Sequence, residues 1–299
     1  MRLRVGCAFE YDTAWATPAV MLVQPHPDNP SPVVQESWTA EPFVASHEYR
    51  DSFDNRCRRL TLPSGTTTLR YDALVDISDE PDEVESTATQ FAVEDLPDDV
   101  LVYTLASRYC LSDALSATAW HLFGESSLGW ARVQAVCDWL NQHIRYGLYS
   151  TPLTTAVDVY VAQGGMCRDF AHLAVTFCRA LNIPARYVFG YMPDVSLPPP
   201  YPPMDFHAWF EVYLCGPQGG RWYTFDARFN RPLIGRIPIG HGRDAVDVAM
   251  MTTYGAAQFR QMTVWCDVAG EEHAPTLITS APADCADTTA GQVIDRPAQ

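Results

Sequence analysis

The sequence predicts an α+β protein, with an antiparallel β-sandwich domain followed by a core that contains helices and further strands. Three observations support this fold class. Apolar and polar residues alternate in short runs up to residue 77, helical periodicity dominates residues 113–182, and strand-like runs return from residue 186. Strands and helices that occupy separate stretches of a chain are typical of α+β folds rather than of α/β folds.

Residues 1–90 are expected to form the β-sandwich domain. Alternate positions of the first eleven residues are apolar, and further β-prone runs lie at 20–23, 33–38 and 66–77. Turn-forming residues separate these runs, and short strands at regular spacing favour an antiparallel sandwich. An acidic stretch follows at 78–100, and we interpret it as the solvated junction to the second domain.

The second domain is expected to span residues 91–270 and to begin with helices. Apolar periodicity, capping residues and helix-ending residues predict four of them, at residues 113–124, about 130–143, 154 or 155 to 163, and 167 to about 182. Cys137 and Cys178 lie on the apolar stripes of the second and fourth helices, so we interpret both as core residues.

Strand periodicity returns after the fourth helix. Strands are predicted at 186–191, 206–214, 222–226 and 262–268, with one more helix at 245–254. The Pro-rich segment 192–204 is interpreted as a stiff surface loop that can form one wall of a substrate cleft. Residues 271–299 are rich in Ala, Pro, Thr and Asp without periodicity, and we expect a disordered tail there.

The composition narrows the classes of function. A net charge of −16 argues against nucleic-acid binding, because no basic surface can be assembled at that balance. All 20 basic residues are arginine, which we attribute to codon bias. The nine cysteines include no Cys-x-x-Cys pair, so neither a disulfide framework nor a zinc site is expected. With no signal-peptide pattern and no membrane-spanning stretch, a reduced, cytoplasmic protein without a membrane partner is the expectation.

The stretch GGMCRDFAH, residues 164–172, contains the strongest candidate for catalysis. Cys167 opens the fourth predicted helix, where the positive end of the helix dipole favours the nucleophilic thiolate. The two preceding glycines are expected to permit a tight turn and to let backbone N–H groups approach a substrate carbonyl. The competing interpretation is a buried structural cysteine at the start of a helix.

A catalytic cysteine needs a base, and the base needs a residue that orients it. His207 and Asp226 are the best candidates, because adjacent strands of a short hairpin can bring their side chains together. A cysteine on a helix followed along the chain by a histidine and an aspartate on a sheet is the arrangement of papain-like acyl-transfer sites. Spacing alone therefore predicts a thiol-dependent site.

Several segments resemble bacterial transglutaminase-like proteins. The resemblance rests on GMCRDFAH (165–172), NIPARYVFGY (182–191), DFHAWFEVY (205–213), WYTFDA (222–227) and GHGRDA (240–245). It extends over the N-terminal β-domain and covers the chain to about residue 270. It implies a papain-like transglutaminase core with Cys167, His207 and Asp226 as a catalytic triad. Relatives often carry Thr or Pro soon after the aspartate, whereas Ala227-Arg228 follows here, so Arg228 is expected to alter the pocket.

Other residues receive weaker assignments. Relatives use an upstream aromatic or amide side chain to stabilise the oxyanion, and Tyr146 is the candidate for that role here. A tyrosine that only packs on the core is the competing interpretation. Asp169 and Trp209 are candidate substrate-binding residues. His172 lies one turn after Asp169, and we expect these two side chains to interact and brace the helix.

The resemblance implies acyl transfer without a cofactor. Cys167 would attack an amide or peptide carbonyl, His207 would protonate the departing amine, and water or a primary amine would resolve the thioester. Two alternatives stay open: a non-catalytic binding or scaffold protein that keeps the fold, and a metal site formed by Cys167, His172 and His207. The sequence does not give the peptide or protein substrate, choose between hydrolysis and transamidation, or give the oligomeric state.

Overall fold

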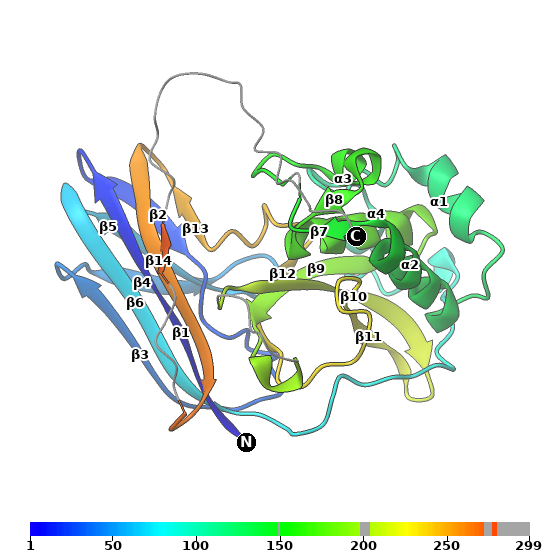
Figure 1. Ribbon diagram of the computed structural model, residues 1–299, viewed down its shortest axis with the longest axis horizontal. Helices are drawn as coiled ribbons and strands as arrows, with labels where there is room; N and C mark the ends of the chain where they lie inside the picture. The colour runs from blue at the N-terminus through cyan, green and yellow to red at the C-terminus, as the bar shows by residue number, and fades with distance from the viewer. Residues whose placement is uncertain (149, 198–203, 272–276, 280–299) are drawn as a thin grey trace, which may run out of the picture.

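The computed structural model describes residues 1–148, 150–197, 204–271 and 277–279. Two lobes lie side by side, a β-sandwich and a second lobe in which helices pack against a separate antiparallel sheet (Figure 1). The chain passes from the sandwich to the second lobe and returns to the sandwich near its end. The α+β class predicted from the sequence is confirmed.

The sandwich consists of a sheet with strand order β15-β14-β1-β6-β3 and a sheet with strand order β13-β2-β5-β4. The strands are β1 Arg2–Thr13, β2 Thr17–Met21, β3 Val33–Glu41, β4 Ser46–Arg50, β5 Arg56–Leu62, β6 Gly65–Asp76, β13 Met251–Thr253, β14 Ala257–Val268 and β15 Leu277–Thr279. Apolar residues at alternate positions of β1, from Leu3 to Tyr11, are buried. Because alternate side chains of a strand point to opposite faces, this pattern turns one face of the sheet inward.

The C-terminal strands change the expected division of the chain. β13 pairs with β2, and β14 pairs with β1, so the sandwich is built from both ends of the sequence. This differs from the predicted second domain at 91–270, which included β14. β15 lies within the tail that was predicted to be disordered, and it pairs with β14. Apart from β15, the residues of that tail beyond Glu271 lie outside the described residues. Periodicity identifies a strand but not its partner, which explains the difference.

The helix predicted at 245–254 is wrong. The chain forms turns there and then enters β13. Asp244 Oδ1 accepts a hydrogen bond from the Val246 N–H at 2.9 Å, and Asp247 Oδ2 accepts one from the Arg243 N–H at 2.9 Å. Aspartate side chains that bond nearby backbone groups offer the chain an alternative to a helix.

The second lobe contains a sheet with strand order β11-β10-β9-β12, in which all neighbouring strands are antiparallel. Its strands are β9 Ala185–Tyr191, β10 His207–Gly216, β11 Gly219–Phe225 and β12 Ile237–Gly242, and its α-helices are α1 Ser116–Phe123, α2 Trp130–His143, α3 Ala156–Ala162 and α4 Cys167–Ala180. Three short 3₁₀ helices complete the lobe, at Val93–Asp95, Leu101–Thr104 and Asp194–Ser196. The four helices predicted between residues 113 and 182 and the predicted hairpin are confirmed to within a few residues, whereas β12 was not predicted.

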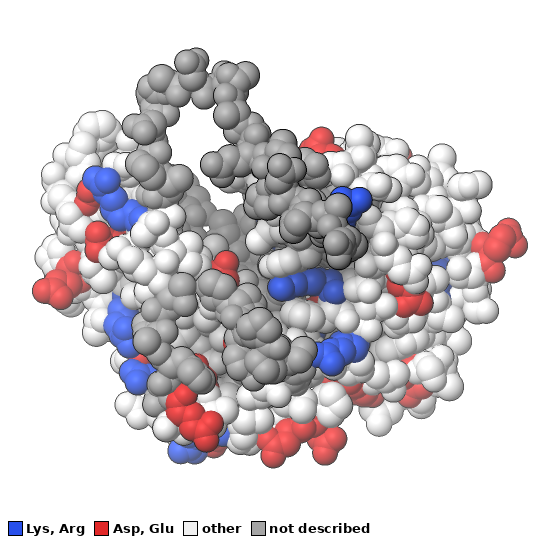
Figure 2. All heavy atoms as spheres, viewed as in Figure 1, with Lys and Arg blue, Asp and Glu red and all other residues white. Residues whose placement is uncertain are grey.

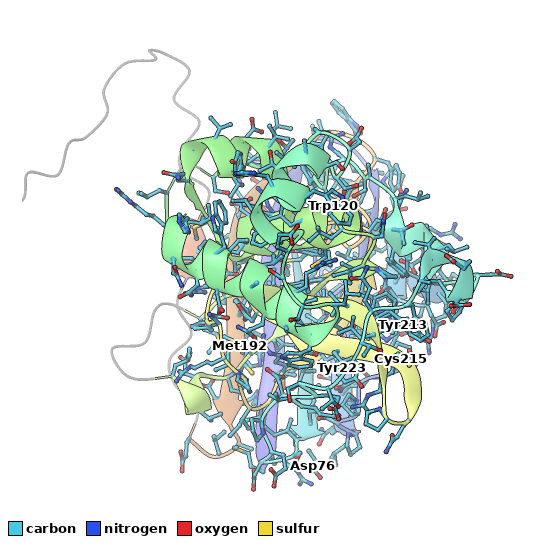
Figure 3. All side chains as sticks on the ribbon, turned by 90° about the vertical axis from the view of Figure 1, so that its right-hand side faces the viewer. Asp76, Trp120, Met192, Tyr213, Cys215 and Tyr223 are labelled. Atoms are coloured by element: carbon cyan, nitrogen blue, oxygen red, sulfur yellow. The ribbon has the colours of Figure 1, made fainter. Side chains whose placement is uncertain are left out.

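The helix α4 lies at the centre of the second lobe. Every residue from Asp169 to Ala180 is buried, because α4 packs against β9, β10 and the other three helices. Figure 3 shows the helices over the core sheet, with Tyr213, Cys215 and Tyr223 of the β10–β11 hairpin near its edge. This burial fixes the position of Cys167, the first residue of α4.

One apolar cluster joins the two lobes. It contains sandwich residues such as Phe9 and Tyr71 together with Phe189, Tyr191 and Phe206 of the second lobe. Each large side chain contributes about 1.5–3 kcal/mol when fully buried, so a shared cluster holds the lobes in a defined arrangement.

The visible surface mixes charges of both signs. Figure 2 shows acidic and basic side chains interspersed on one face, without a continuous basic patch. Among the residues that the structure describes, no helix combines the length and apolar character needed to cross a bilayer.

Candidate active site

Cys167 stands apart from most other cysteines in the chain. Among the described cysteines, only Cys167 and Cys215 are partly exposed. Burial raises the pKa of the Cys110 and Cys178 thiols to about 12, so neither ionises readily. Cys167 lies at the N-terminus of a 14-residue helix, where the dipole favours an anion.

The start of α4 is fixed by Asp169. Its Oδ2 accepts a hydrogen bond from the Met166 N–H at 2.8 Å, and its Oδ1 lies 2.9 Å from Arg168 Nη2. The side chain is fully buried and does not line the cleft that contains Cys167. The prediction that Asp169 binds substrate is therefore not supported, because its carboxylate is occupied in capping the helix.

The two glycines before Cys167 act differently from the prediction. Gly164–Gly165 forms the short strand β8, which pairs in parallel with β7, Arg145–Tyr146. The turn itself is made by Gln163, which has a positive φ of 51°. A Cβ on Gly165 would lie 2.6 Å from Asp169 Cβ, so a glycine is required for close approach of the capping side chain. The β7–β8 pair also holds Tyr146 next to the start of α4.

His207 and Asp226 meet as the hairpin predicts. His207 Nε2 lies 2.7 Å from Asp226 Oδ2, and both side chains are almost fully buried. In the β10–β11 register, Phe210 pairs with Phe225. One residue further along, Asp226 lies opposite Trp209, and it is therefore the diagonal neighbour of His207. Diagonal neighbours on one face of an antiparallel pair are within reach of each other.

Electrostatics favour a charged pair. Burial disfavours the imidazolium of His207, but the charge and hydrogen bond of Asp226, together with a hydrogen bond to Cys167, outweigh it and raise the pKa of His207. Burial likewise disfavours the Asp226 carboxylate, but the charges of His207 and Arg236 hold the pKa of Asp226 well below its usual range. Because Nε2 faces Asp226, Nδ1 is the ring nitrogen that remains available to the Cys167 thiol.

Arg236 is a member of this network that sequence reasoning missed. Its Nη2 lies 2.9 Å from Asp226 Oδ2 and its Nε lies 2.9 Å from Asp82 Oδ2, with only 5% of the side chain exposed. The guanidinium also lies over the Trp209 ring, 5.0 Å from its centroid. Asp82 belongs to the acidic stretch that the sequence suggested is solvated. No spacing in the sequence indicates this pairing, since Arg236 lies outside every predicted element.

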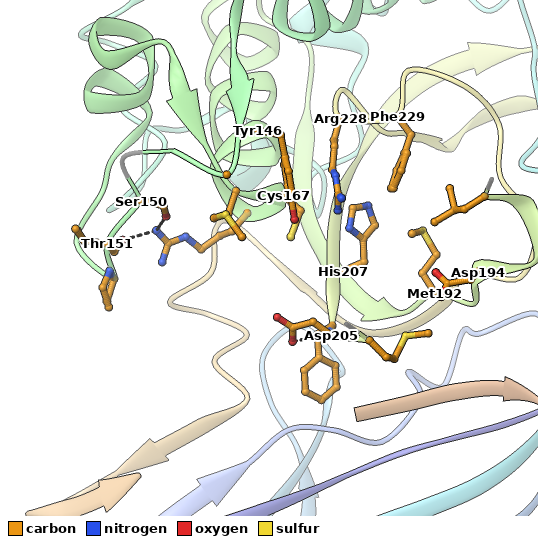
Figure 4. Close-up of a pocket in the computed structure, with 17 residues that line it drawn as sticks. Tyr146, Ser150, Thr151, Cys167, Met192, Asp194, Asp205, His207, Arg228 and Phe229 are labelled. Atoms are coloured by element: carbon orange, nitrogen blue, oxygen red, sulfur yellow. Dashed lines mark hydrogen bonds between the residues drawn. The ribbon is translucent and has the colours of Figure 1, made fainter. Parts of the chain in front are cut away.

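A cleft of about 610 Å³ opens above Cys167 and His207. Tyr146, Arg168, Asp205, Arg228 and Phe229 are among its lining residues (Figure 4). Met192, Asp194, Leu197 and Met204 also line it, so the described ends of the predicted loop 192–204 do form part of one wall. Residues 198–203, the centre of that loop, lie outside the described residues.

Tyr146, the candidate oxyanion donor, lies in the same cleft as Cys167. Arg228 stacks on it, with Cζ 3.6 Å from the ring centroid. Burial, followed by the proximity of Cys167, raises the pKa of Tyr146, so its hydroxyl keeps the proton that a hydrogen-bond donor needs. Tyr146 belongs to the short strand β7.

Trp209 and His172 lie away from the cleft. Trp209 is 2% exposed and packs beneath Arg236, so the prediction that it binds substrate is not supported. His172 is fully buried, and its Nε2 accepts a hydrogen bond from the Ala245 N–H at 3.1 Å instead of contacting Asp169. Burial lowers the pKa of His172 to about 3. The alternative metal site loses a ligand as a result, because His172 does not line the cleft with Cys167 and His207.

Comparison with known proteins agrees with this geometry. Residues 122–227 match the family model of the transglutaminase-like superfamily, a range that includes Cys167, His207 and Asp226. A crystal structure of a candidate cysteine protease from Cytophaga hutchinsonii is 31% identical in sequence, with a TM-score of 0.77 over 92% of this chain and 93% of that chain. The similarity thus extends over the β-sandwich as well as the second lobe.

Two sets of curated relatives match a shorter region. An uncharacterized protein of Mycobacterium leprae is 29% identical over 129 residues, and uncharacterized proteins of Mycobacterium bovis and Mycobacterium tuberculosis are 37% identical over 108 residues. These alignments cover 39% and 33% of this chain and 42% and 33% of the respective relatives. Since the structural match covers 92% of this chain and the family model matches residues 122–227, the chain belongs to the transglutaminase-like superfamily.

Proposed function

We propose that the protein is a cysteine-dependent acyl-transfer enzyme that acts on an amide or peptide bond. The observation that supports this most directly is the position of Cys167. Cys167 is partly exposed in a cleft, at a helix N-terminus, and shares that cleft with a histidine that a buried aspartate orients. A nucleophile, a base and an orienting residue in this order form the constellation that covalent catalysis requires.

The first half-reaction forms a thioester. The Cys167 thiolate attacks the carbonyl carbon, and the carbonyl π electrons move to the oxygen. When the tetrahedral intermediate collapses, the C–N bond breaks and the nitrogen takes a proton from the His207 imidazolium. Asp226 keeps the ring oriented and its charge favours the imidazolium. The Cys167 N–H and the Tyr146 hydroxyl are the proposed oxyanion donors.

The second half-reaction restores the enzyme. Neutral His207 takes a proton from water or from a primary amine, whose oxygen or nitrogen attacks the thioester carbon. Collapse breaks the C–S bond and releases a carboxylic acid or a new amide, together with the thiolate. Hydrolysis and transamidation differ only in this acceptor, so one site supports either outcome.

Cysteine alkylation tests the proposal, and Cys215 provides an internal control of similar exposure without a histidine base. Iodoacetamide should label Cys167 at least about tenfold faster than Cys215, because Cys167 lies at a helix N-terminus and shares its cleft with His207. His207→Ala should remove the difference. Equal rates at the two cysteines, unaffected by His207→Ala, would favour the non-catalytic alternative.

A second experiment separates the two acceptors. The protein is incubated with a peptide amide library, with and without a primary amine, and the products are identified by mass spectrometry. Hydrolase activity produces acids in both conditions, whereas transamidase activity produces amine adducts. Cys167→Ala should abolish either product, and persistence of the products in that variant would contradict the proposal.

A further inference from the structure

Arg228 is held rigidly in the cleft beside the proposed catalytic pair. Its backbone N–H donates to Asp226 Oδ1 at 3.0 Å, and its carbonyl accepts from Asn141 Nδ2 at 2.7 Å. The guanidinium lies 3.6 Å from the Tyr146 ring centroid and 4.5 Å from that of Phe229. Figure 4 shows its side chain near those of Cys167 and His207. Stacking on two rings fixes a side chain that is otherwise flexible.

Within the described part of the chain, no carboxylate contacts the Arg228 guanidinium. The other arginine of the cleft, Arg168, is paired with Asp169 at 2.9 Å. In a chain with 36 acidic and 20 basic residues, an arginine that lacks an acidic partner inside the cleft is notable. A planar guanidinium matches a carboxylate with two parallel hydrogen bonds, and such charge-assisted bonds are among the strongest available to a ligand.

We infer that Arg228 binds a carboxylate of the substrate, so that the cleft selects anionic amide or peptide substrates. This inference rests on the proposed function and specifies its substrate class. The carboxylate has two chemical sources, the free C-terminus of a peptide or an acidic side chain near the reacting bond. A role for Arg228 in stabilising the oxyanion can be distinguished from this one, because it would affect the rates with charged and neutral substrates alike.

Two alkylating reagents test the inference without knowledge of the natural substrate. The Cys167 thiolate displaces iodide from iodoacetate or from iodoacetamide, which differ only in a carboxylate and an amide. The iodoacetate-to-iodoacetamide rate ratio should be higher at Cys167 than at Cys215. Arg228→Met should lower the ratio at Cys167 about tenfold, as expected for loss of a charge-assisted pair. Arg228→Lys should restore part of it.

Arg108→Met is the matched control. Arg108 is exposed and also lies over a tyrosine, with Cζ 5.5 Å from the Tyr109 ring centroid, but it does not line the cleft. The control changes the net charge equally and should leave the ratio unchanged. A wild-type ratio at Cys167 equal to that at Cys215, or a ratio insensitive to Arg228→Met, overturns the inference. Faster labelling of Cys167 than of Cys215 by iodoacetamide would still support the proposed function in that case.

Competition then distinguishes the two carboxylate sources. N-acetylglycine offers an α-carboxylate, and the α-amide of N-acetylglutamic acid offers only a side-chain carboxylate. Each is added as a protectant of Cys167 against iodoacetamide, next to its fully amidated analogue. Protection by either acid above its amide supports a carboxylate site and identifies the source. Equal protection by acids and amides contradicts the inference.

A different cavity carries a second inference. A cleft of about 480 Å³ between the lobes also has Cys167 and His207 in its lining. Beside the charged residues Arg168 and Asp205, its lining is mainly apolar and comes from both lobes, and it includes Phe9, Phe189, Ala249, Met250, Met251 and Met262. Cys167 and His207 therefore lie between two clefts that share Arg168 and Asp205; Arg228 lines the first cleft and not the second, which is mainly apolar.

The geometry points to an apolar substrate group in this inter-lobe cleft, next to the carbonyl that Cys167 attacks. The volume is in the range of small-molecule sites and suits a large aliphatic or aromatic side chain. The three methionines supply an adaptable surface, because their unbranched side chains adjust to differently shaped ligands. This inference also rests on the proposed function but not on Arg228.

Alkylation again provides the test, with N-hexyl iodoacetamide compared with iodoacetamide. The hexyl-to-plain rate ratio should be higher at Cys167 than at Cys215, and Ala249→Phe should lower it about tenfold by filling the cleft. Ala249→Val should lower the ratio less. Ala45→Phe is the control, because Ala45 lies in a surface groove of the sandwich, and it should leave the ratio unchanged. If the hexyl-to-plain rate ratio at Cys167 does not decrease as residue 249 becomes larger, this second inference is overturned.

Discussion

At the scale of single residues, Asp226 has the most fully satisfied side chain of the site. Its Oδ2 accepts hydrogen bonds from His207 and Arg236, and its Oδ1 accepts from the N–H groups of Arg228 and Phe229 at 3.0 and 3.1 Å. A carboxylate with several donors and two adjacent cations stays ionised in a buried site. One side chain thus orients the proposed base and fixes the backbone of the proposed carboxylate-binding arginine.

Replacement of Asp226 should make stability depend on pH in a defined way. The raised pKa of His207 contributes stability that is complete below its unfolded pKa of about 6.5 and is lost as pH rises through the folded pKa. The lowered pKa of Asp226 contributes stability that is complete above its unfolded pKa of about 3.9 and is lost as pH falls. Asp226→Asn should therefore lower the free energy of unfolding most between about pH 4 and 6.5.

Urea unfolding at a series of pH values measures this difference. The free energy of unfolding of Asp226→Asn is subtracted from that of the wild type at each pH. Asp72→Asn is a control at a partly buried aspartate that pairs with Arg4 in the sandwich, where no histidine shares the carboxylate. A difference for Asp226→Asn that does not shrink above pH 7 would show that His207 is not charged in the folded protein.

Arg236 should be a structural requirement for the same site. Arg236→Met leaves the buried Asp226 and the partly buried Asp82 without their shared cation, and loss of one partner of a buried ion pair typically lowers the free energy of unfolding by about 3–5 kcal/mol. Asp82→Asn combined with Arg236→Met should recover part of that loss, because one uncompensated charge is gone. Thermal and urea unfolding of the two single variants and the double variant measure the coupling. Additive losses would contradict a shared network.

At the scale of elements, α4 determines where the proposed nucleophile lies. Its start depends on a buried capping carboxylate, on a glycine at 165 and on the β7–β8 pair. These are local features within some twenty residues of Cys167, and the GGMCRD segment already indicates a helix that begins at the cysteine. The hairpin of β10 and β11 supplies the other two residues in the same local manner.

Gly165→Ala tests the importance of this local geometry. The added methyl group would lie 2.6 Å from Asp169 Cβ, so the helix cap must move. We expect a loss of about 1–3 kcal/mol in stability and slower labelling of Cys167 by iodoacetamide. Gly255→Ala is the control, because the nearest atom to its new Cβ is a Thr17 methyl carbon at 3.2 Å. Unchanged stability and labelling in Gly165→Ala would show that the cap is not needed.

The sequence predicts local features better than distant ones. The boundaries of α2, the start of α4 and the meeting of His207 with Asp226 follow from periodicity and short spacing. The pairing of Arg236 with Asp82 joins residues 154 positions apart, and no pattern in either segment indicates the other. The helix predicted at 245–254 failed for a related reason, since aspartate–backbone bonds and pairing with β2 outweighed helical propensity.

At the scale of the whole molecule, the sandwich is a wall of the proposed site as well as a separate lobe. Phe206, next to His207, packs against Phe9 of β1, with ring centroids 6.3 Å apart, and against Tyr191 of β9 at 5.4 Å. The C-terminal strand β14 pairs with the edge of β1 that faces away from β6. The apolar inter-lobe cleft therefore exists only when both lobes are folded and in contact.

The shared apolar cluster predicts that the two lobes unfold together. Buried cysteines report on each lobe, with Cys7 and Cys266 in the sandwich and Cys137 and Cys178 in the second lobe. In increasing urea, pulses of a thiol reagent should label both pairs at the same midpoint. Phe123 is buried in the core of the second lobe, and Phe123→Ala should lower the free energy of unfolding by about 3–5 kcal/mol. The urea midpoint for labelling should then decrease equally for all four cysteines. If only Cys137 and Cys178 shift, the lobes fold independently, and the inter-lobe cleft would require docking of separately folded parts rather than one cooperative fold.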